Sequence, residues 1–178
     1  MNVGGLGLPR IFRCRYDNRC MTSITERHFV PCPYGLAKTF LANELFPTDG
    51  GQLEWILHVA PPTLKGIELS KDVDVSVSRA IDPMHFDQPW HVTWTPHGGG
   101  PYPTFTGTLT VRADEDWNVS ALELKGSYDP PLGPAGKAFD LLLGSRLATL
   151  TAKALLAQVG DRLIAHYRSN EASKKTAP

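Results

Sequence analysis

The sequence has few cysteines, no excess of charge of either sign and no long apolar run, and each shortage argues against a class of protein. Its three cysteines, Cys14, Cys20 and Cys32, cannot form a full disulfide framework. Without an export signal we expect them to be reduced thiols of a cytoplasmic protein. Eighteen basic residues balance eighteen acidic ones, so no nucleic-acid partner is predicted, because phosphate binding needs a net basic face. No stretch approaches the ~20 apolar residues of a membrane-spanning helix.

Catalytic and metal-binding signatures are also scarce. Gly98-Gly99-Gly100 lacks the Lys-Ser/Thr that follows in a phosphate-binding loop, and the chain has no Gly-x-Ser-x-Gly nucleophile elbow. His91 and His97 are not expected to share a metal ion, because the strand between them would span about 20 Å. We therefore predict no metal site and no cofactor.

The first 22 residues differ in composition from the rest. Between Met1 and Cys20 the chain has four arginines against one acid and lacks the apolar segment of a secretory signal. Three interpretations stay open: an unstructured extension, a mitochondrial presequence, or translation that starts at Met21. We expect residues 1–22 to lie outside the fold, residues 23–168 to form one domain, and residues 169–178 to be a polar tail.

Periodic patterns after this segment predict an α+β domain. A strand at 24–31 and a short helix at 34–46 come first. Alternating apolar residues then predict further strands at 53–59, 67–81, 90–94, 104–112 and 120–128. The clearest alternation is in residues 72–78, where Val73, Val75 and Val77 are predicted to face the core. In the last strand Glu123 is expected to point to water. Short connections between strands with one apolar face favour an antiparallel sheet.

The C-terminal third has helical periodicity from Ala135 to about Tyr167. Roughly 32 residues at a rise of ~1.5 Å would give a rod of about 48 Å. Its apolar stripe, which includes Leu147, Leu155 and Leu163, must be covered by other residues. Only the apolar face of the predicted sheet is large enough, so we expect a curved antiparallel sheet wrapped around a long C-terminal helix.

Two segments carry a resemblance to a known family. The first is Phe29-Val30-Pro31-Cys32-Pro33 before the short helix, and the second is Tyr128-Asp129-Pro130-Pro131-Leu132-Gly133-Pro134-Ala135-Gly136 running into Phe139-Asp140-Leu141-Leu142. With the order of elements, from about Ser23 to Tyr167, they resemble the helix-grip fold of the SRPBCC superfamily, which includes START lipid-transfer domains, CoxG-like proteins and polyketide cyclases. The resemblance implies an apolar cavity between sheet and helix, often holding a lipid, polyketide or other aromatic molecule. It implies no universal catalytic residue.

Several inward side chains are candidates for a ligand site in that cavity. The predicted set is Arg79, Trp90, Trp94, Phe105, Tyr128 and Phe139. Arg79 and Lys71 are an even number of residues apart, so on a regular strand both side chains would face the cavity. A cation in the cavity could hold a carboxylate or an enolate, unless a bulge or the strand end turns it outward. The aromatic side chains either line a pocket or fill it as ordinary core.

These features favour a protein that binds a small apolar or aromatic ligand. One alternative is an enzyme like a polyketide cyclase or aromatase, with Arg79, Tyr128 or His91 assisting proton transfer. Another is a structural or interaction protein with a filled core. No catalytic residue is assigned, and a homodimer stays open as an assembly.

Overall fold

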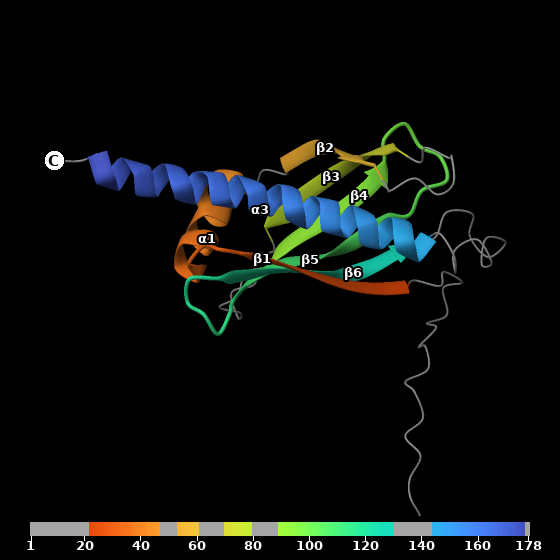
Figure 1. The fold of residues 1–178 in the computed structure, drawn as a ribbon. Helices are drawn as coiled ribbons and strands as arrows, with labels where there is room; N and C mark the ends of the chain where they lie inside the picture. Colours follow the sequence, from red (N-terminus) through yellow and green to blue (C-terminus); the bar gives the residue numbers. More distant parts are fainter. Residues whose placement is uncertain (1–21, 47–52, 61–69, 80–88, 130–143, 177–178) are drawn as a thin grey trace, which may run out of the picture.

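An antiparallel sheet and a long helix dominate the computed structural model, which describes residues 22–46, 53–60, 70–79, 89–129 and 144–176 (Figure 1). The six strands of the sheet pair in the order β1-β6-β5-β4-β3-β2. All neighbouring strands are antiparallel. The described elements are β1 (Thr22–Val30), α1 (Tyr34–Phe40), the π-helical turn η1 (Leu41–Leu45), β2 (Leu53–Val59), β3 (Lys71–Arg79), β4 (Trp90–Pro96), β5 (Thr104–Ala113), β6 (Ser120–Asp129) and α3 (Ser145–Thr176).

Alternation of apolar residues decides which face of the sheet is buried. Val73, Val75 and Val77 of β3 are buried, and the residues between them are more exposed. On β4 the buried positions are Trp90 and Trp94, with Val92 between them. Successive side chains of a strand point to opposite faces, so these positions form one apolar inner face. The predicted α+β class and one-sided antiparallel sheet are confirmed.

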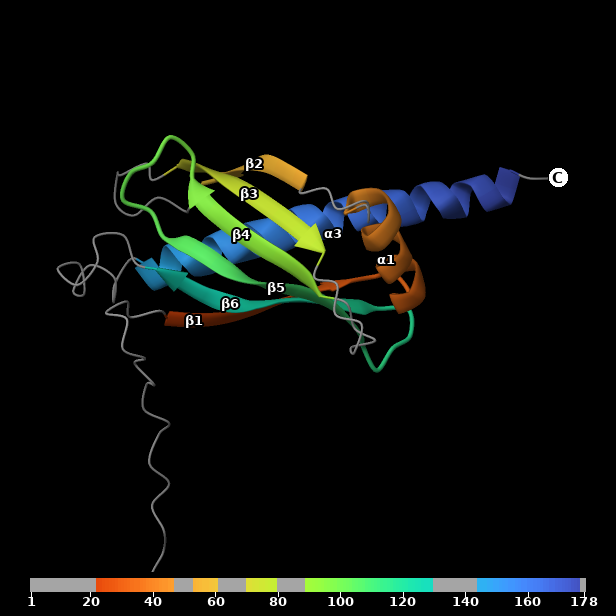
Figure 2. The same cartoon turned by 180° about the vertical axis from the view of Figure 1, so that it is seen from behind.

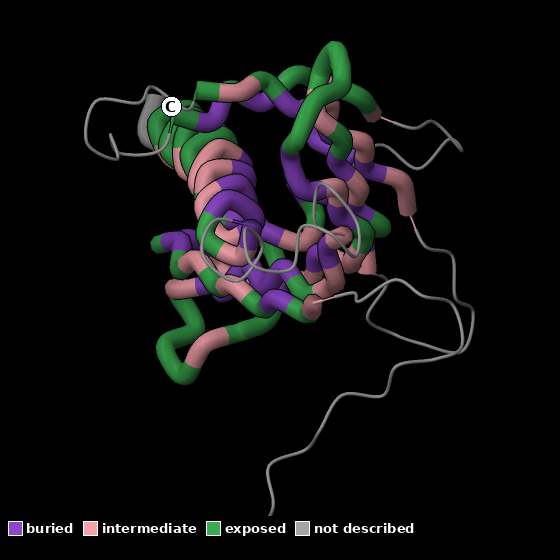
Figure 3. The backbone as a smooth tube through the Cα atoms, turned by 90° about the vertical axis from the view of Figure 1, so that its right-hand side faces the viewer, coloured by how far each residue is buried: buried purple, intermediate pink, exposed green. Residues whose placement is uncertain are grey.

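Two glycines at the centre of the sheet allow close packing on this inner face. Gly107 of β5 and Gly126 of β6 are register partners. A Cβ atom on Gly107 would lie 2.5 Å from Cζ of Phe105, and one on Gly126 would lie 2.6 Å from it. The Phe105 ring therefore covers the surface that two side chains would otherwise occupy. Glycines in strands mark bends or close approaches, and here the sheet curves around α3 (Figure 3).

Helix α3 lies along the concave side of the sheet (Figures 1 and 2). It packs mainly on β1 and also contacts β6 and β2, so it reaches both edge strands. Gly160 brings the helix close to β1, because a Cβ there would lie 2.8 Å from Cδ2 of His28. Leu155 and Leu163 of the predicted stripe are buried. This arrangement confirms the helix-grip fold expected from the sequence.

The C-terminal end of α3 differs from the prediction. The helix continues to Thr176 instead of ending near Tyr167. The apolar stripe ends where the helix passes the end of the sheet (Figure 1). The backbone hydrogen bonds of the helix do not depend on that stripe, and they continue beyond it. Polar contacts continue along this last part, including the ion pair between Lys174 Nζ and Glu171 Oε1 at 2.7 Å. The predicted beginning of the helix, residues 135–143, lies outside the described residues.

Glu123 also differs from the prediction. It is on the outer face of β6, as its parity requires, but it is only 6% exposed. Arg27 of β1 and Arg112 of β5 cover it, with the Arg27 guanidinium bonded to Oε2 and Arg112 Nε 3.4 Å from Oε1. The two arginines neutralise a carboxylate that would otherwise be buried without a partner.

Candidate functional site

Strand register separates the predicted site residues into two rows on the inner face. Trp94, Phe105 and Tyr128 are successive partners across β4, β5 and β6. Arg79 and Trp90 are partners across β3 and β4. Trp90 and Trp94 are about 13 Å apart along their strand, so the rows lie at different ends of the inner face. We call these the Trp94 end and the Trp90 end. Phe139, the remaining predicted residue, lies outside the described residues.

At the Trp94 end the aromatic rings are packed against one another. The rings of Trp94 and Phe105 stack with their centroids 4.0 Å apart and their planes 11° apart. The indole Nε1 of Trp94 donates a hydrogen bond to the carbonyl oxygen of Pro103 at 3.2 Å. Trp94, Phe105 and Tyr128 are each at most 2% exposed. These residues have the packing and hydrogen bonding of an ordinary protein core.

A hydroxyl chain connects the Trp94 end to α3. The Thr151 hydroxyl donates to the carbonyl oxygen of Leu147 at 2.8 Å, and its oxygen lies 2.6 Å from the hydroxyl oxygen of Tyr102. Because the single Thr151 hydroxyl hydrogen is used on Leu147, Tyr102 is the donor to Thr151. Burial raises the pKa of Tyr102 above its usual range. This connection was not predicted from the sequence, although Thr151 is a polar interruption in an apolar stretch of helix.

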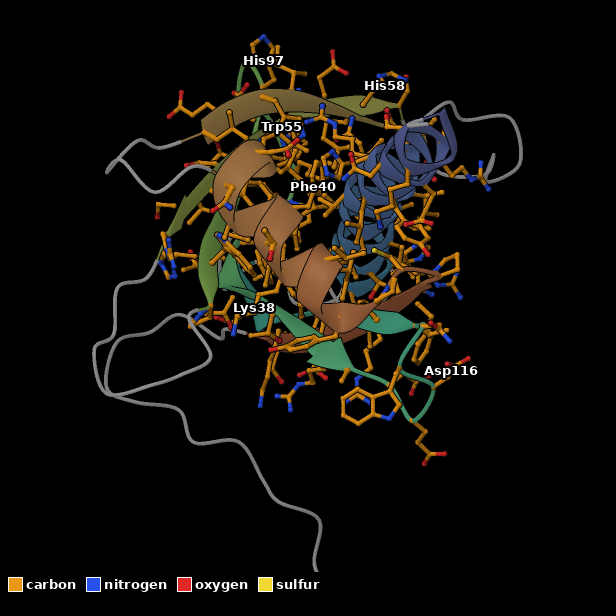
Figure 4. The ribbon with its side chains drawn as sticks, turned by 90° about the vertical axis from the view of Figure 1, so that its left-hand side faces the viewer. Lys38, Phe40, Trp55, His58, His97 and Asp116 are labelled. Carbon is orange, nitrogen blue, oxygen red and sulfur yellow. The ribbon has the colours of Figure 1, made fainter. Side chains whose placement is uncertain are left out.

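At the Trp90 end the aromatic packing continues onto η1 and β2. Phe46, which follows η1, lies between two indoles, with ring centroids 5.9 Å from Trp90 and 6.3 Å from Trp55. Trp55 points inward from β2 (Figure 4), and its Nε1 donates to Oε1 of Gln158 on α3 at 2.8 Å. Phe46 and Gln158 were not among the predicted site residues, because neither has a recognisable motif.

The indole N–H of Trp90 is the exception at this end. Trp90 is 3% exposed, and its Nε1 has no hydrogen-bond partner among the described residues. A buried donor without an acceptor is destabilising by about 1–3 kcal/mol, and such groups are rare in native proteins. Arg79, its register partner, is only partly buried. The arrangement offers a hydrogen-bond donor to an acceptor atom inside an apolar environment.

Two other polar residues considered in the sequence, Lys71 and His91, do not lie at the Trp90 end of the inner face. Lys71 Nζ donates to the carbonyl oxygen of Gly99 at 2.9 Å, so its ammonium group is bound to the loop after β4. His91 is exposed on the outer face, so it does not lie with the predicted site residues of the inner face. Its parity is opposite to that of Trp90 and Trp94. Within the described part of the chain, no three His, Cys, Asp or Glu side chains are grouped as metal ligands.

A separate pocket lies away from the inner face, between α1 and α3. Its volume is about 160 Å³. Its lining includes Cys32, Phe40, Leu163 and His166. Cys32 is buried, and burial raises the pKa of its thiol. This pocket has no local signal in the sequence, because its lining comes from segments far apart in the chain.

The strand order and α3 define a helix-grip α+β protein. The chain aligns with the Zhui aromatase/cyclase from Streptomyces sp. R1128 at 17% identity and a TM-score of 0.45, over 80% of this chain and 93% of that one. Norcoclaurine synthase from Thalictrum flavum aligns at 13% identity and a TM-score of 0.41, over 88% and 98% of the two chains. No protein-family model and no curated protein sequence matches the chain.

These similarities are too weak to transfer a site or a reaction, and the fold assignment depends on the strand order and on α3. Among the helices that the structure describes, none is long and apolar enough to cross a membrane.

Proposed function

We propose that the protein binds a small apolar or aromatic molecule between the inner face of the sheet and α3, at the Trp90 end. The observation that carries this proposal is the buried Trp90 N–H, which has no acceptor among the described residues. A carbonyl or other acceptor oxygen of the ligand would accept its hydrogen bond. Phe46 and Trp55 supply apolar surface next to it. Ligand pockets commonly combine such surface with a few polar groups.

The filled-core alternative applies to the other end of the inner face. At the Trp94 end the indole N–H has an acceptor and the rings are in contact. Tyr128 belongs to that row, whereas Arg79 belongs to the Trp90 row, so Tyr128 lies away from a ligand bound at the Trp90 end. We therefore propose binding and assign no reaction.

Two probes of matched shape test this proposal. 2-Acetylnaphthalene carries a carbonyl oxygen and 2-ethylnaphthalene does not. Wild type should bind the ketone about three- to tenfold more tightly, the value of one net hydrogen bond. Trp90→Phe should abolish this preference, and the matched variant Trp94→Phe should keep it. Dissociation constants from calorimetry decide the result. Absence of saturable binding, or a ketone preference that survives in Trp90→Phe, contradicts the proposal.

The role of Arg79 is tested separately with 2-naphthoate. If the guanidinium faces the ligand, Arg79→Met should weaken naphthoate by roughly tenfold or more, because hydrogen bonds to charged groups contribute about 1.5–3 kcal/mol. Binding of 2-acetylnaphthalene should change much less. Equal losses for the anionic and the neutral probe would remove Arg79 from the site.

A further inference from the structure

The pocket between α1 and α3 has the size of a single aromatic ring. Its volume of about 160 Å³ is close to the roughly 150 Å³ of an engineered apolar cavity that binds benzene. Phe40 points from α1 into the space between the two helices (Figure 4). Leu163 and Cys32 are buried side chains of the same lining. Burial raises the pKa of Cys32, so its thiol is neutral at physiological pH and adds no charge.

Three polar side chains on one rim of this pocket are linked by hydrogen bonds whose donors and acceptors can be assigned. Oε2 of Glu44 lies 3.0 Å from Nδ1 of His166, and Nδ2 of Asn170 lies 2.8 Å from Nε2 of the same ring. An ionised carboxylate can only accept a hydrogen bond, so in the neutral imidazole the hydrogen is on Nδ1. Nε2 is then an acceptor, and the Asn170 amide donates to it. Asn170 is exposed and can turn away into solvent.

The position of Glu44 depends on an unusual turn of helix. Residues Leu41–Leu45 form a π-helical turn, in which the Phe46 N–H donates to the carbonyl oxygen of Leu41 at 2.8 Å. Such turns are rare and occur frequently at functional sites. In this chain the turn carries the carboxylate that orients His166. The His166 ring also contacts Phe40, with centroids 4.2 Å apart and ring planes tilted by 30°.

We propose that this pocket is a second binding site, for a phenol: one aromatic ring that carries a hydroxyl group. The ring packs against Phe40, Leu163 and Cys32. The hydroxyl donates to Nε2 of His166 and displaces the amide of Asn170. Glu44 holds the imidazole in the tautomer that accepts this hydrogen bond. The site is distinct from the Trp90 end, because its lining comes from α1, η1 and the C-terminal part of α3.

Phenol and toluene are the probes that test this second site. Titration of the full chain with phenol, followed by amide NMR spectra, should shift resonances of residues 36–44 and 163–170 saturably. The indole signal of Trp90 should stay in place, which separates this site from the first one. Phenol should bind several-fold more tightly than toluene. Perturbation confined to other residues, or no saturable shift, overturns the proposal.

Two variants test whether Nε2 of His166 accepts the hydrogen bond of phenol, and they should change phenol affinity in opposite directions. His166→Phe keeps a ring on Phe40 but removes Nε2, and should weaken phenol about three- to tenfold while leaving toluene within twofold. Asn170→Ala removes the exposed competitor and should strengthen phenol about twofold or more. Because Asn170 is exposed, this variant tests the proposal even if His166→Phe does not fold. If Asn170→Ala leaves phenol binding unchanged or weaker, or if His166→Phe weakens both probes equally, the acceptor role of His166 is overturned.

Discussion

The two ends of the inner face both carry a buried tryptophan from β4, and the two indoles have different hydrogen-bond environments. Trp94 donates its N–H to Pro103 and stacks on Phe105. Trp90 is nearly as buried, but its N–H has no acceptor among the described residues. A core residue gains from satisfying its polar atom, whereas a binding residue must leave that atom for the ligand. In the account proposed above, the Trp94 end stabilises the fold and the Trp90 end binds the ligand.

The largest expected effect comes from removing the ring that closes the Trp94 end. Phe105→Ala deletes the stacking partner of Trp94 and the cover of Gly107 and Gly126, and should lower the free energy of unfolding by about 3–5 kcal/mol. The matched control is Phe29→Ala on β1, because Phe29 is 57% exposed and should change stability by only about 0.5 kcal/mol. Urea denaturation measures both. Comparable losses in the two variants would show that this end is not a packed core.

Two identical substitutions compare the two ends directly. Trp94→Phe removes ring volume and also leaves the Pro103 carbonyl without its donor, so a loss of about 2–3 kcal/mol in unfolding free energy is expected. Trp90→Phe removes similar volume but also removes an unsatisfied donor. It should therefore be less destabilising, by about 1 kcal/mol or more. Equal destabilisation, measured by denaturant unfolding without ligand, would mean that the indole N–H groups are equally satisfied.

A smaller effect concerns the hydroxyl chain from Tyr102 to α3. Tyr102→Phe should lower the unfolding free energy by about 1 kcal/mol at neutral pH, because Thr151 keeps its bond to Leu147. Burial raises the folded-state pKa of Tyr102, so above pH ~10 the unfolded chain loses this proton before the folded one does. The stabilisation that protonated Tyr102 adds to the unfolding free energy is therefore full below that pH. It is lost as the pH rises through the raised pKa of the folded state. Thermal unfolding of both proteins between about pH 8 and 12 should show a steeper loss for wild type. Parallel curves would contradict this.

Alternation along the sequence predicted the strands and the face that each side chain occupies, because parity needs only local information. Trp90, Trp94, Phe105 and Tyr128 are accordingly on the inner face. Parity could not predict which of them are neighbours across the sheet, because register depends on pairing between distant segments.

The same dependence on distant segments explains the contacts of Glu123 and His166. Glu123 is buried by arginines from two other strands, and His166 meets Glu44 only through the packing of α3 beside η1. Whether an indole N–H finds an acceptor also depends on a distant carbonyl, as the bond from Trp94 to Pro103 shows. These contacts follow from the fold and have no local signature in the sequence.

The indole N–H resonances of the chain's four tryptophans test the central comparison most directly. Trp55 and Trp94 are bonded within the protein, and Trp117 is 78% exposed. Saturation with 2-acetylnaphthalene should move the Trp90 resonance downfield more than 2-ethylnaphthalene does, because only the ketone supplies an acceptor. The other three indoles should respond similarly to the two probes. A Trp90 resonance that both probes shift equally, or that neither shifts, would contradict the account.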